Sequence, residues 1–517
     1  MKSPQFIEAN QSDYRLDYTP LQLVLPIDMF NYIGKDDSIH TFMEVIGGIN
    51  LKAFINSKHI GRQEYEDTMM LRIILFAYTE NITSLRAIEK ACRVDTRFIW
   101  IANGKRPSFM AFQRFINEKI KGSINDIFTA INNYIIDADD VDIDTLYLDG
   151  TKIEANATKF SFVWKKSILN YQDKLMDKVT REIDLMKHHS SLRFVTKETY
   201  ESKDILKIQT ALYRYLADNG IELVYGSGKR KHPVQRHYDI IKELQMKAET
   251  YERHLEIMGE RNSYSKTDHD ATFMHGKEDY YSRTGIFKPY YNVQIGVSDE
   301  YITHLKLFPN PTDTKTFKPF FDSYYERYGV YPSYPVADAG YGSYDNYLYC
   351  LEKGMGLWQK YGKYSKEKES KFKKELYNTK NMTQGHLSFT SENGYLFEHV
   401  YDRTSNKSEI PYITQIYQCK EWTETLKQEG MPRSISYNPV LSELHNKAKE
   451  NLDSDHGIRL KTQRSIQVEG AFGVIKSNMK YNRFHRRGSK NVENEMILIA
   501  IGYNIKKYHM KKKRTIH

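Results

Sequence analysis

Three acidic residues stand where carboxylates could bind divalent metal ions. Asp149 follows the apolar stretch 146–148, and Asp338 follows the apolar pair 336–337. A glycine comes soon after each aspartate, so we expect each to end a short buried strand at a turn. Glu469 lies beside an apolar stripe at helical spacing, with two glycines nearby that leave space for another molecule.

Carboxylates arranged in this way are suited to phosphoryl transfer. Mg²⁺ prefers oxygen ligands and takes one or two carboxylates, which leaves room for water and phosphate. Two such ions about 4 Å apart activate the attacking oxygen and stabilise the leaving one. Without metal, clustered carboxylates repel one another and raise one another's pKa. The alternative for each aspartate alone is an ordinary strand-ending turn.

Basic residues accompany these acids. Lys476 stands two helical turns after Glu469, and we expect it to meet a phosphate; the alternative is an exposed helix lysine. Lys152 and Asn156 follow Asp149, and either reach phosphate or lie in a surface turn. The loop 266–270 is rich in short polar groups and is a candidate lining of the site. A basic run after the glutamate helix is expected to contact backbone phosphates, or else to form a solvated face: Arg483, Arg486 and Arg487.

The N-terminal part of the chain reads as helical. After an extended lead-in at 5–30, we expect helices around 39–57 and 65–79. The segments 82–94 and 107–122 then resemble a helix-turn-helix, with Arg114 off the apolar stripe of the second helix. Docking of that helix in a DNA major groove is one interpretation, and a small helical bundle without DNA contact is the other.

Composition narrows the class of protein. The chain has 517 residues, is 40% hydrophobic and 27% charged, and carries a net charge of +10. This balance is typical of a soluble globular protein with a polyanionic partner, nucleic acid first. No leader and no membrane-spanning run is visible, and the three cysteines lie far apart. We therefore expect a cytoplasmic, nucleoid-associated protein without disulfides.

The remaining segments complete the outline. Alternating residues at 288–309 predict a hairpin, and a helix is expected at 315–328. The polar segment 160–260 reads as helical, and the segment 360–450 contains strand patterns. Helical patterns at 463–480 and 490–508 close the chain before a basic tail.

Several blocks resemble, in order, those of bacterial insertion-sequence transposases of the DDE class: "LDGTKIEANA", "KTDHDATFM", "YYNVQIGV", "VADAGYGS" and "VEGAFGVIK". The similar branch carries Asp-Gly-Thr-Lys-Ile-Glu-Ala-Asn at its first aspartate. The resemblance implies an α/β catalytic core of the RNase H-like kind, a mixed sheet flanked by helices. It also implies the triad Asp149, Asp338 and Glu469 and two Mg²⁺ (or Mn²⁺) ions per active site.

The resemblance and the sequence patterns together give a domain layout. The resemblance implies a helical N-terminal domain, which we place at 1–135, and the patterns predict a helical insertion at 160–261, a mixed insertion at 359–450 and a basic tail at 511–517. The catalytic core comprises the remaining segments: 142–159, 262–358 and 451–510.

Two departures from the related pattern concern the region before the glutamate. Relatives often place Tyr and Arg seven and four residues before it, where this chain has Thr462 and Ser465. Arg464 stands one residue off, and we keep it as a DNA-binding candidate. Relatives also often carry a cysteine cluster in the second insertion, where only Cys419 is found, so no zinc site is expected there.

The function implied is cleavage of DNA at the ends of an insertion sequence and joining of those ends to target DNA. The partners implied are the terminal inverted repeats, target DNA and a second copy of the chain, without a membrane. Two alternatives stay open. One is a metal-dependent nuclease on the same fold that joins no strands, and the other is a catalytically silent, domesticated DNA-binding protein.

Overall fold

The computed structural model describes residues 33–56, 65–226, 228–276, 285–406, 408–428 and 430–516. The extended lead-in expected at 5–30 lies outside these residues. Helices and strands alternate in the described ranges, which makes the fold mixed α/β. No helix within them is both long and apolar enough to cross a lipid bilayer.

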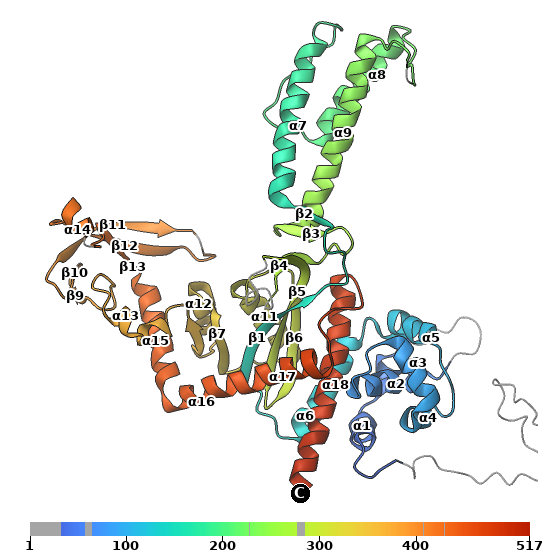
Figure 1. Cartoon of the computed structure of the whole chain (residues 1–517), viewed down its shortest axis with the longest axis vertical. Coiled ribbons are helices and arrows are strands. Elements are labelled where there is room, and N and C mark those ends of the chain that lie inside the picture. Colours follow the sequence, from blue (N-terminus) through green and yellow to red (C-terminus); the bar gives the residue numbers. More distant parts are fainter. Residues whose placement is uncertain are drawn as a thin grey trace, which may run out of the picture.

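A six-stranded mixed sheet forms the centre of the molecule (Figure 1). Its middle strand, β1, pairs antiparallel with β5 on one side and parallel with β7 on the other. The far edge of β5 carries β4 and β6, and the far edge of β7 carries β8. The strands are β1 (Thr145–Glu154), β4 (Thr272–His275), β5 (Phe287–Ser298), β6 (Tyr301–Phe308), β7 (Tyr334–Gly342) and β8 (Gln359–Tyr361).

Alternate residues of β1 enter two different hydrophobic cores, because successive side chains of a strand point to opposite faces. Leu146 and Leu148 pack with the helices on one face, and Tyr147 and Ile153 pack with those on the other. The first face is covered by α11 (Phe317–Tyr328), α12 (Tyr344–Glu352) and α15 (Pro439–Asp453). The hairpin predicted at 288–309 and the helix predicted at 315–328 are confirmed as β5–β6 and α11.

The expectation that each aspartate ends its strand is wrong, because β7 continues from Asp338 to Gly342 and β1 continues beyond Asp149. The strand continues to Glu154, and its pairing with β5 runs unbroken from Tyr147–Val297 to Glu154–Tyr290. The reason is β5, a strand of twelve residues that offers backbone partners well beyond the aspartate. Residues 359–361 also differ from the expected layout, because they form β8 of the central sheet and not part of an insertion.

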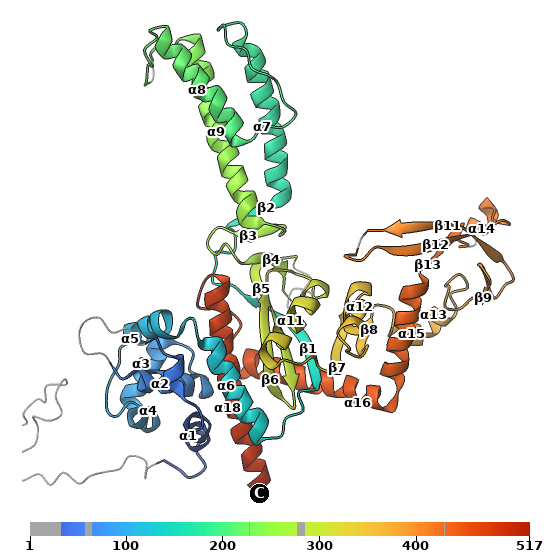
Figure 2. The same ribbon diagram turned by 180° about the vertical axis from the view of Figure 1, so that it is seen from behind.

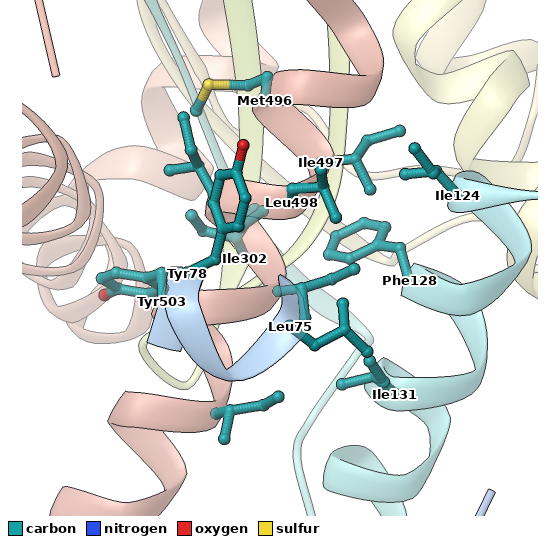
Figure 3. Close-up of a cluster of buried hydrophobic side chains, with 14 of the residues drawn as sticks. Leu75, Tyr78, Ile124, Phe128, Ile131, Ile302, Met496, Ile497, Leu498 and Tyr503 are labelled. Carbon is teal, nitrogen blue, oxygen red and sulfur yellow. The ribbon is translucent and has the colours of Figure 1, made fainter. Parts of the chain in front are cut away.

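The second face of the sheet is covered by the helices at the two ends of the chain. The long helix α18 (Ser489–Ile516) packs between the sheet and the N-terminal helices (Figures 1 and 2). Figure 3 shows this core, in which side chains of α2, α6, α18 and β6 interdigitate. The basic residues from Lys511 continue α18 and do not form a separate tail. The N-terminal helices are α1 (Ser38–Gly47), α2 (Asp67–Thr79), α3 (Leu85–Val94), α4 (Thr96–Ile101), α5 (Phe109–Arg114) and α6 (Ile124–Ala138).

Two further units project from the central sheet (Figure 1). Three helices form an arm with its own core: α7 (Lys165–Met186), α8 (Ser202–Asp218) and α9 (Pro233–Met258). The arm joins the body through the short pair β2 (Phe162–Trp164) and β3 (Ser263–Ser265). The second unit also has its own core and contains β9 (Thr383–Gly385), β10 (Ser388–Thr390), β11 (Leu396–Ser405), β12 (Tyr412–Cys419), β13 (Ser434–Tyr437), α13 (Ser370–Lys373) and α14 (Glu424–Gln428).

The contact between α2 and α18 depends on a glycine. An ideal Cβ built on Gly502 would lie 2.3 Å from the backbone carbonyl oxygen of Tyr78. Because both atoms belong to or are fixed by the backbone, no change of side-chain rotamer can remove this clash. We expect Gly502→Ala to lower the free energy of unfolding by about 1–3 kcal/mol, because α2 and α18 must separate. Urea unfolding followed by circular dichroism measures this.

The matched control is Gly47→Ala in α1, where the added Cβ meets nothing within 4 Å. This variant should keep or slightly raise the stability, since alanine is the better helix former by about 1 kcal/mol. Equal stability of the two variants would contradict the close-packed crossing.

Candidate active site

Asp149 and Asp338 lie side by side on the central sheet. The parallel pairing of β1 with β7 ends at Tyr147 and Val336, and each aspartate stands two residues further along its strand. Tyr147 and Val336 both belong to the core on the α18 face. Because side chains two residues apart share a face, both aspartates point to that same face, where the two strands part.

Local hydrogen bonds orient both carboxylates. Asp149 Oδ1 accepts the backbone N–H of Gly150 at 2.8 Å, and Asp338 Oδ1 accepts that of Gly340 at 2.8 Å. Both side chains are partly exposed to solvent.

Glu469 comes from the helical stretch that crosses this face of the sheet. The stretch consists of α16 (Asp455–Arg464), a π-helical turn (Ser465–Glu469), α17 (Gly470–Gly473) and a second π-helical turn (Val474–Asn478). Val468, Ala471 and Ile475 anchor it in the core, whereas Glu469 is exposed. Cβ atoms built on Gly470 and Gly473 would meet nothing within 4 Å, so the space beside the glutamate is open. Irregular π-helical turns often occur at functional sites.

Arg464, at the end of α16, lies against Asp149. Its Nη1 atom is 3.5 Å from Asp149 Oδ2, and the residue is 9% exposed. Among the described residues, its Nε and Nη1 atoms have no hydrogen-bond partner. A buried guanidinium with unused donors is costly unless a ligand supplies acceptors.

The π-helical turn accounts for the one-residue departure of Arg464 from the related pattern. Arg464 stands five residues before Glu469, and the intervening turn is π-helical, with hydrogen bonds from residue i to i+5. The wider turn absorbs one extra residue and brings Arg464 toward the position that an arginine four residues before the glutamate has in an α-helix.

Lys476 provides a second cation on the same helical stretch. Its Nζ atom donates to Thr151 Oγ1 at 2.7 Å, and Thr151 follows Asp149 by two residues on the same face of β1. Arg464 and Lys476 thus both reach β1 from the helical stretch that carries Glu469.

Asp313 also lies in this region, although the sequence analysis did not predict it as a site residue. Its Oδ1 atom accepts the side-chain amides of Asn292 and Gln294, each at 2.9 Å. The Gln294 amide lies across Gly150, where an ideal Cβ would be 2.1 Å from its nitrogen, so β1 needs a glycine there. Only the tertiary fold brings these groups together, although a polar pair inside the apolar strand β5 is a signal for a buried network.

The charges of the region act together on Tyr341, whose hydroxyl donates to Gln294. Burial raises the pKa of Tyr341 well above its ordinary value, and the carboxylates of Asp313, Asp149 and Asp338 raise it further. The guanidinium of Arg464 acts in the opposite direction. Three carboxylates and one guanidinium therefore lie close enough to share one electrostatic environment.

Other predicted residues bind to the protein itself. Lys152 donates to the carbonyl of His275 at 2.9 Å and points away from Asp149, on the opposite face of β1. Arg483 and Arg487 donate to backbone carbonyls of residues 155–157, just after β1, and so fix that segment. Arg486 Nη1 donates to Asn117 Oδ1 at 3.4 Å. Arg114 is exposed at the end of α5, on the other side of α18 from β7 and β8 (Figures 1 and 2).

The loop 266–270 holds the start of α18. Asp268 accepts the hydroxyl of Tyr291 and the N–H of Gly488, and Asp270 accepts the N–H of Ser489. These bonds satisfy backbone donors at the start of the helix, which have no partners within the helix itself.

The donor chemistry of the site suits a hard divalent cation. Within the described ranges, no group of three or more His, Cys, Asp and Glu side chains is placed to hold a metal ion, so Glu469 does not join the two aspartates there. Mg²⁺ commonly takes only one or two carboxylates and completes its shell with water and phosphate. Asp149 and Asp338 supply two such carboxylates.

Comparisons with known protein families place both ends of the chain. Residues 394–509, which include Glu469 and Lys476, match the family "Transposase DDE domain". Residues 31–118, which include α1 to α5, match the family "Transposase domain (DUF772)". Comparison with curated proteins and with solved structures gave no significant match. The two family matches, one at each end of the chain and in the expected order, support an insertion-sequence transposase of the DDE class.

Proposed function

We propose that this transposase cuts DNA at the ends of its element and joins the freed ends to target DNA, with Asp149, Asp338 and Glu469 as its catalytic residues. The observation that carries the proposal is the placement of Asp149 and Asp338 on neighbouring parallel strands, on one face of the sheet. The family match over residues 394–509 supports the role of Glu469, which lies within it.

We further propose that the catalytic core is RNase H-like. The support comes from the sheet, in which an antiparallel hairpin (β5–β6) pairs with β1 and two strands (β7 and β8) run parallel beyond it. Helices cover both faces of this sheet, as the resemblance implies for such a core.

The acidic and basic residues of the site would have different roles. Asp149 and Asp338 would hold Mg²⁺ or Mn²⁺, with Glu469 completing the set from the helical stretch. Such ions, when bound, activate the attacking oxygen and stabilise the leaving oxygen. Lys476 and Arg464 face the strand that bears the carboxylates and would bind the negative phosphate oxygens, whose charge grows in the transition state.

Contacts away from the reaction would position the DNA. Exposed basic side chains such as Arg114 would contact backbone phosphates, which set the register without reading sequence. Arg483 and Arg487 also stay exposed while they hold the carbonyls of 155–157, and would add to this basic surface. Since both element ends must be processed together, we propose that two copies of the chain act on the paired ends.

Removal of each carboxylate tests the triad. Asp149→Asn, Asp338→Asn and Glu469→Gln should each lower cleavage of a labelled duplex carrying the element's terminal repeat by about a hundredfold or more, because an amide lacks the negative charge and the second oxygen of a carboxylate. The repeat is taken from the DNA that flanks the gene, and cleavage is measured with Mg²⁺ or Mn²⁺. DNA binding, measured by gel shift, should stay within about threefold of wild type.

Glu352→Gln is the matched control, since Glu352 is an exposed carboxylate on α12, pairs only with Lys353 among the residues described, and should keep full activity when changed. Survival of cleavage in a triad variant would mean that its acid is misplaced. Cleavage without joined products would favour the nuclease, and binding without cleavage in wild type would favour the silent DNA-binding protein.

Arg464 allows stability and activity to be separated. Arg464→Lys should lower cleavage about tenfold or more, because lysine keeps the charge but loses the planar fork that suits phosphate. The free energy of unfolding without DNA should change by less than about 1 kcal/mol, since Nε and Nη1 have no hydrogen bonds to lose. Single-turnover cleavage and urea unfolding give the two values.

Arg459→Lys on the same helix is the control, because Arg459 is exposed. If Arg464 served only the fold, stability and cleavage would fall together.

A further inference from the structure

Lys360 lies in the middle of β8, at the edge of the central sheet. Its neighbours Gln359 and Tyr361 point into the core with α12, where Gln359 Nε2 donates to the carbonyl of Pro335 at 2.8 Å. Because side chains alternate along a strand, Lys360 points to the opposite face, which is the face of the two aspartates.

Lys360 lies beside the part of β7 that follows Ala337. β8 pairs with β7 at Gln359–Ala337 and again at Tyr361–Gly342, so the irregular β7 segment 338–341, which begins with Asp338, lies opposite Lys360. Asp149 belongs to β1, the next strand in the sheet. Lys360 and the two aspartates thus come from three neighbouring strands.

The pKa of Lys360 is affected by charges on both sides. Burial lowers the pKa of Lys360, the guanidinium of Arg464 lowers it further, and the carboxylate of Asp338 acts in the opposite direction. Lys360 therefore lies near a buried cation as well as a carboxylate.

Lys360 and Arg464 both have side-chain N–H donors without an acceptor among the described residues. In the part of the chain that the structure describes, no side-chain hydrogen bond or ion pair of Lys360 is found, and Arg464 leaves Nε and Nη1 without hydrogen-bond acceptors. Two cations held close together in a partly buried position repel each other, and this unfavourable energy falls when an anion binds between them.

We propose that Lys360 and Arg464 form a phosphate-binding subsite on the β8 side of Asp338, which takes a backbone phosphate next to the one being cut. The proposal rests on the proposed function for the presence of a DNA strand in this site. Lys476 lies against β1, on the other side of Asp338 in the strand order. The bound strand thus crosses the two aspartates between Lys476 at one end and Lys360 at the other.

Binding of chemically altered DNA tests the subsite without any chemistry. The probe is a set of terminal-repeat duplexes, each with one methylphosphonate near the cleavage position, measured in buffer without divalent cation. For wild type, removal of the charge at one phosphate should weaken binding about tenfold. Lys360→Ala should weaken binding of the unmodified duplex by a similar factor and lower the salt slope by about one.

The decisive measurement combines a Lys360 variant with the modified duplex. With Lys360→Ala or Lys360→Gln, the methylphosphonate that weakened wild-type binding should have no further effect, because the contact is already lost. Lys363→Ala, which changes an exposed lysine just after β8, should behave like wild type. The Gln variant keeps the length of the side chain, so agreement of both variants excludes a folding defect, which circular dichroism also checks.

Other outcomes overturn the subsite. These are an equal effect of every methylphosphonate in wild type and variants, an unchanged affinity of Lys360→Ala, or the same loss with Lys363→Ala. Failure of the proposed function looks different, since wild type would then bind the duplex and show the coupling but cut nothing with Mg²⁺. A wild-type protein that binds no terminal-repeat DNA overturns both.

Discussion

The register of β1 is the constraint on which the rest of the structure depends. This strand has apolar residues on both faces, and each set belongs to a different core. A slip of one residue would move Asp149 to the face of α11 and α12 and would bury the wrong side chains in both cores. The continuous pairing with β5 and the tight approach of Gln294 to Gly150 prevent that slip. The position of the first carboxylate is thus specified by hydrophobic packing and not by contacts of its own.

The site combines groups that would not lie together in a protein selected for stability alone. Asp149, Asp338 and Asp313 all raise the pKa of the same buried tyrosine, and the nearby Arg464 leaves donors unsatisfied. The unfavourable electrostatic energy of this arrangement is offset by hydrophobic packing in two large cores, one on each face of the sheet. Violations of local rules at a functional site, supported by regular packing elsewhere, are common in proteins.

The sequence was informative where a pattern is local. The hairpin 288–309, the helix 315–328 and the two apolar segments that end in Asp149 and Asp338 could all be found from the order of residues. The end of β1 could not, because it depends on the length of β5, nor could the neighbours of Asp313 and Lys360, which come from distant segments. The direction in which Arg464 points along its helix could not be predicted either, since a π-helical turn has no recognisable pattern in the spacing of apolar residues.

The long helix α18 is shared by both ends of the chain, and this affects how the protein is made. Thr41 bonds to His509 and Lys506 bonds to Glu80, across more than four hundred residues. The ribosome delivers the N-terminal helices first, yet their apolar surface has no cover until α18 has left the exit tunnel. The helices of residues 38–138 therefore complete their packing only after α18 has been made. A chain that stops before Ser489 would expose this apolar surface and would be prone to aggregation, so the N-terminal helices depend on α18 for a stable fold.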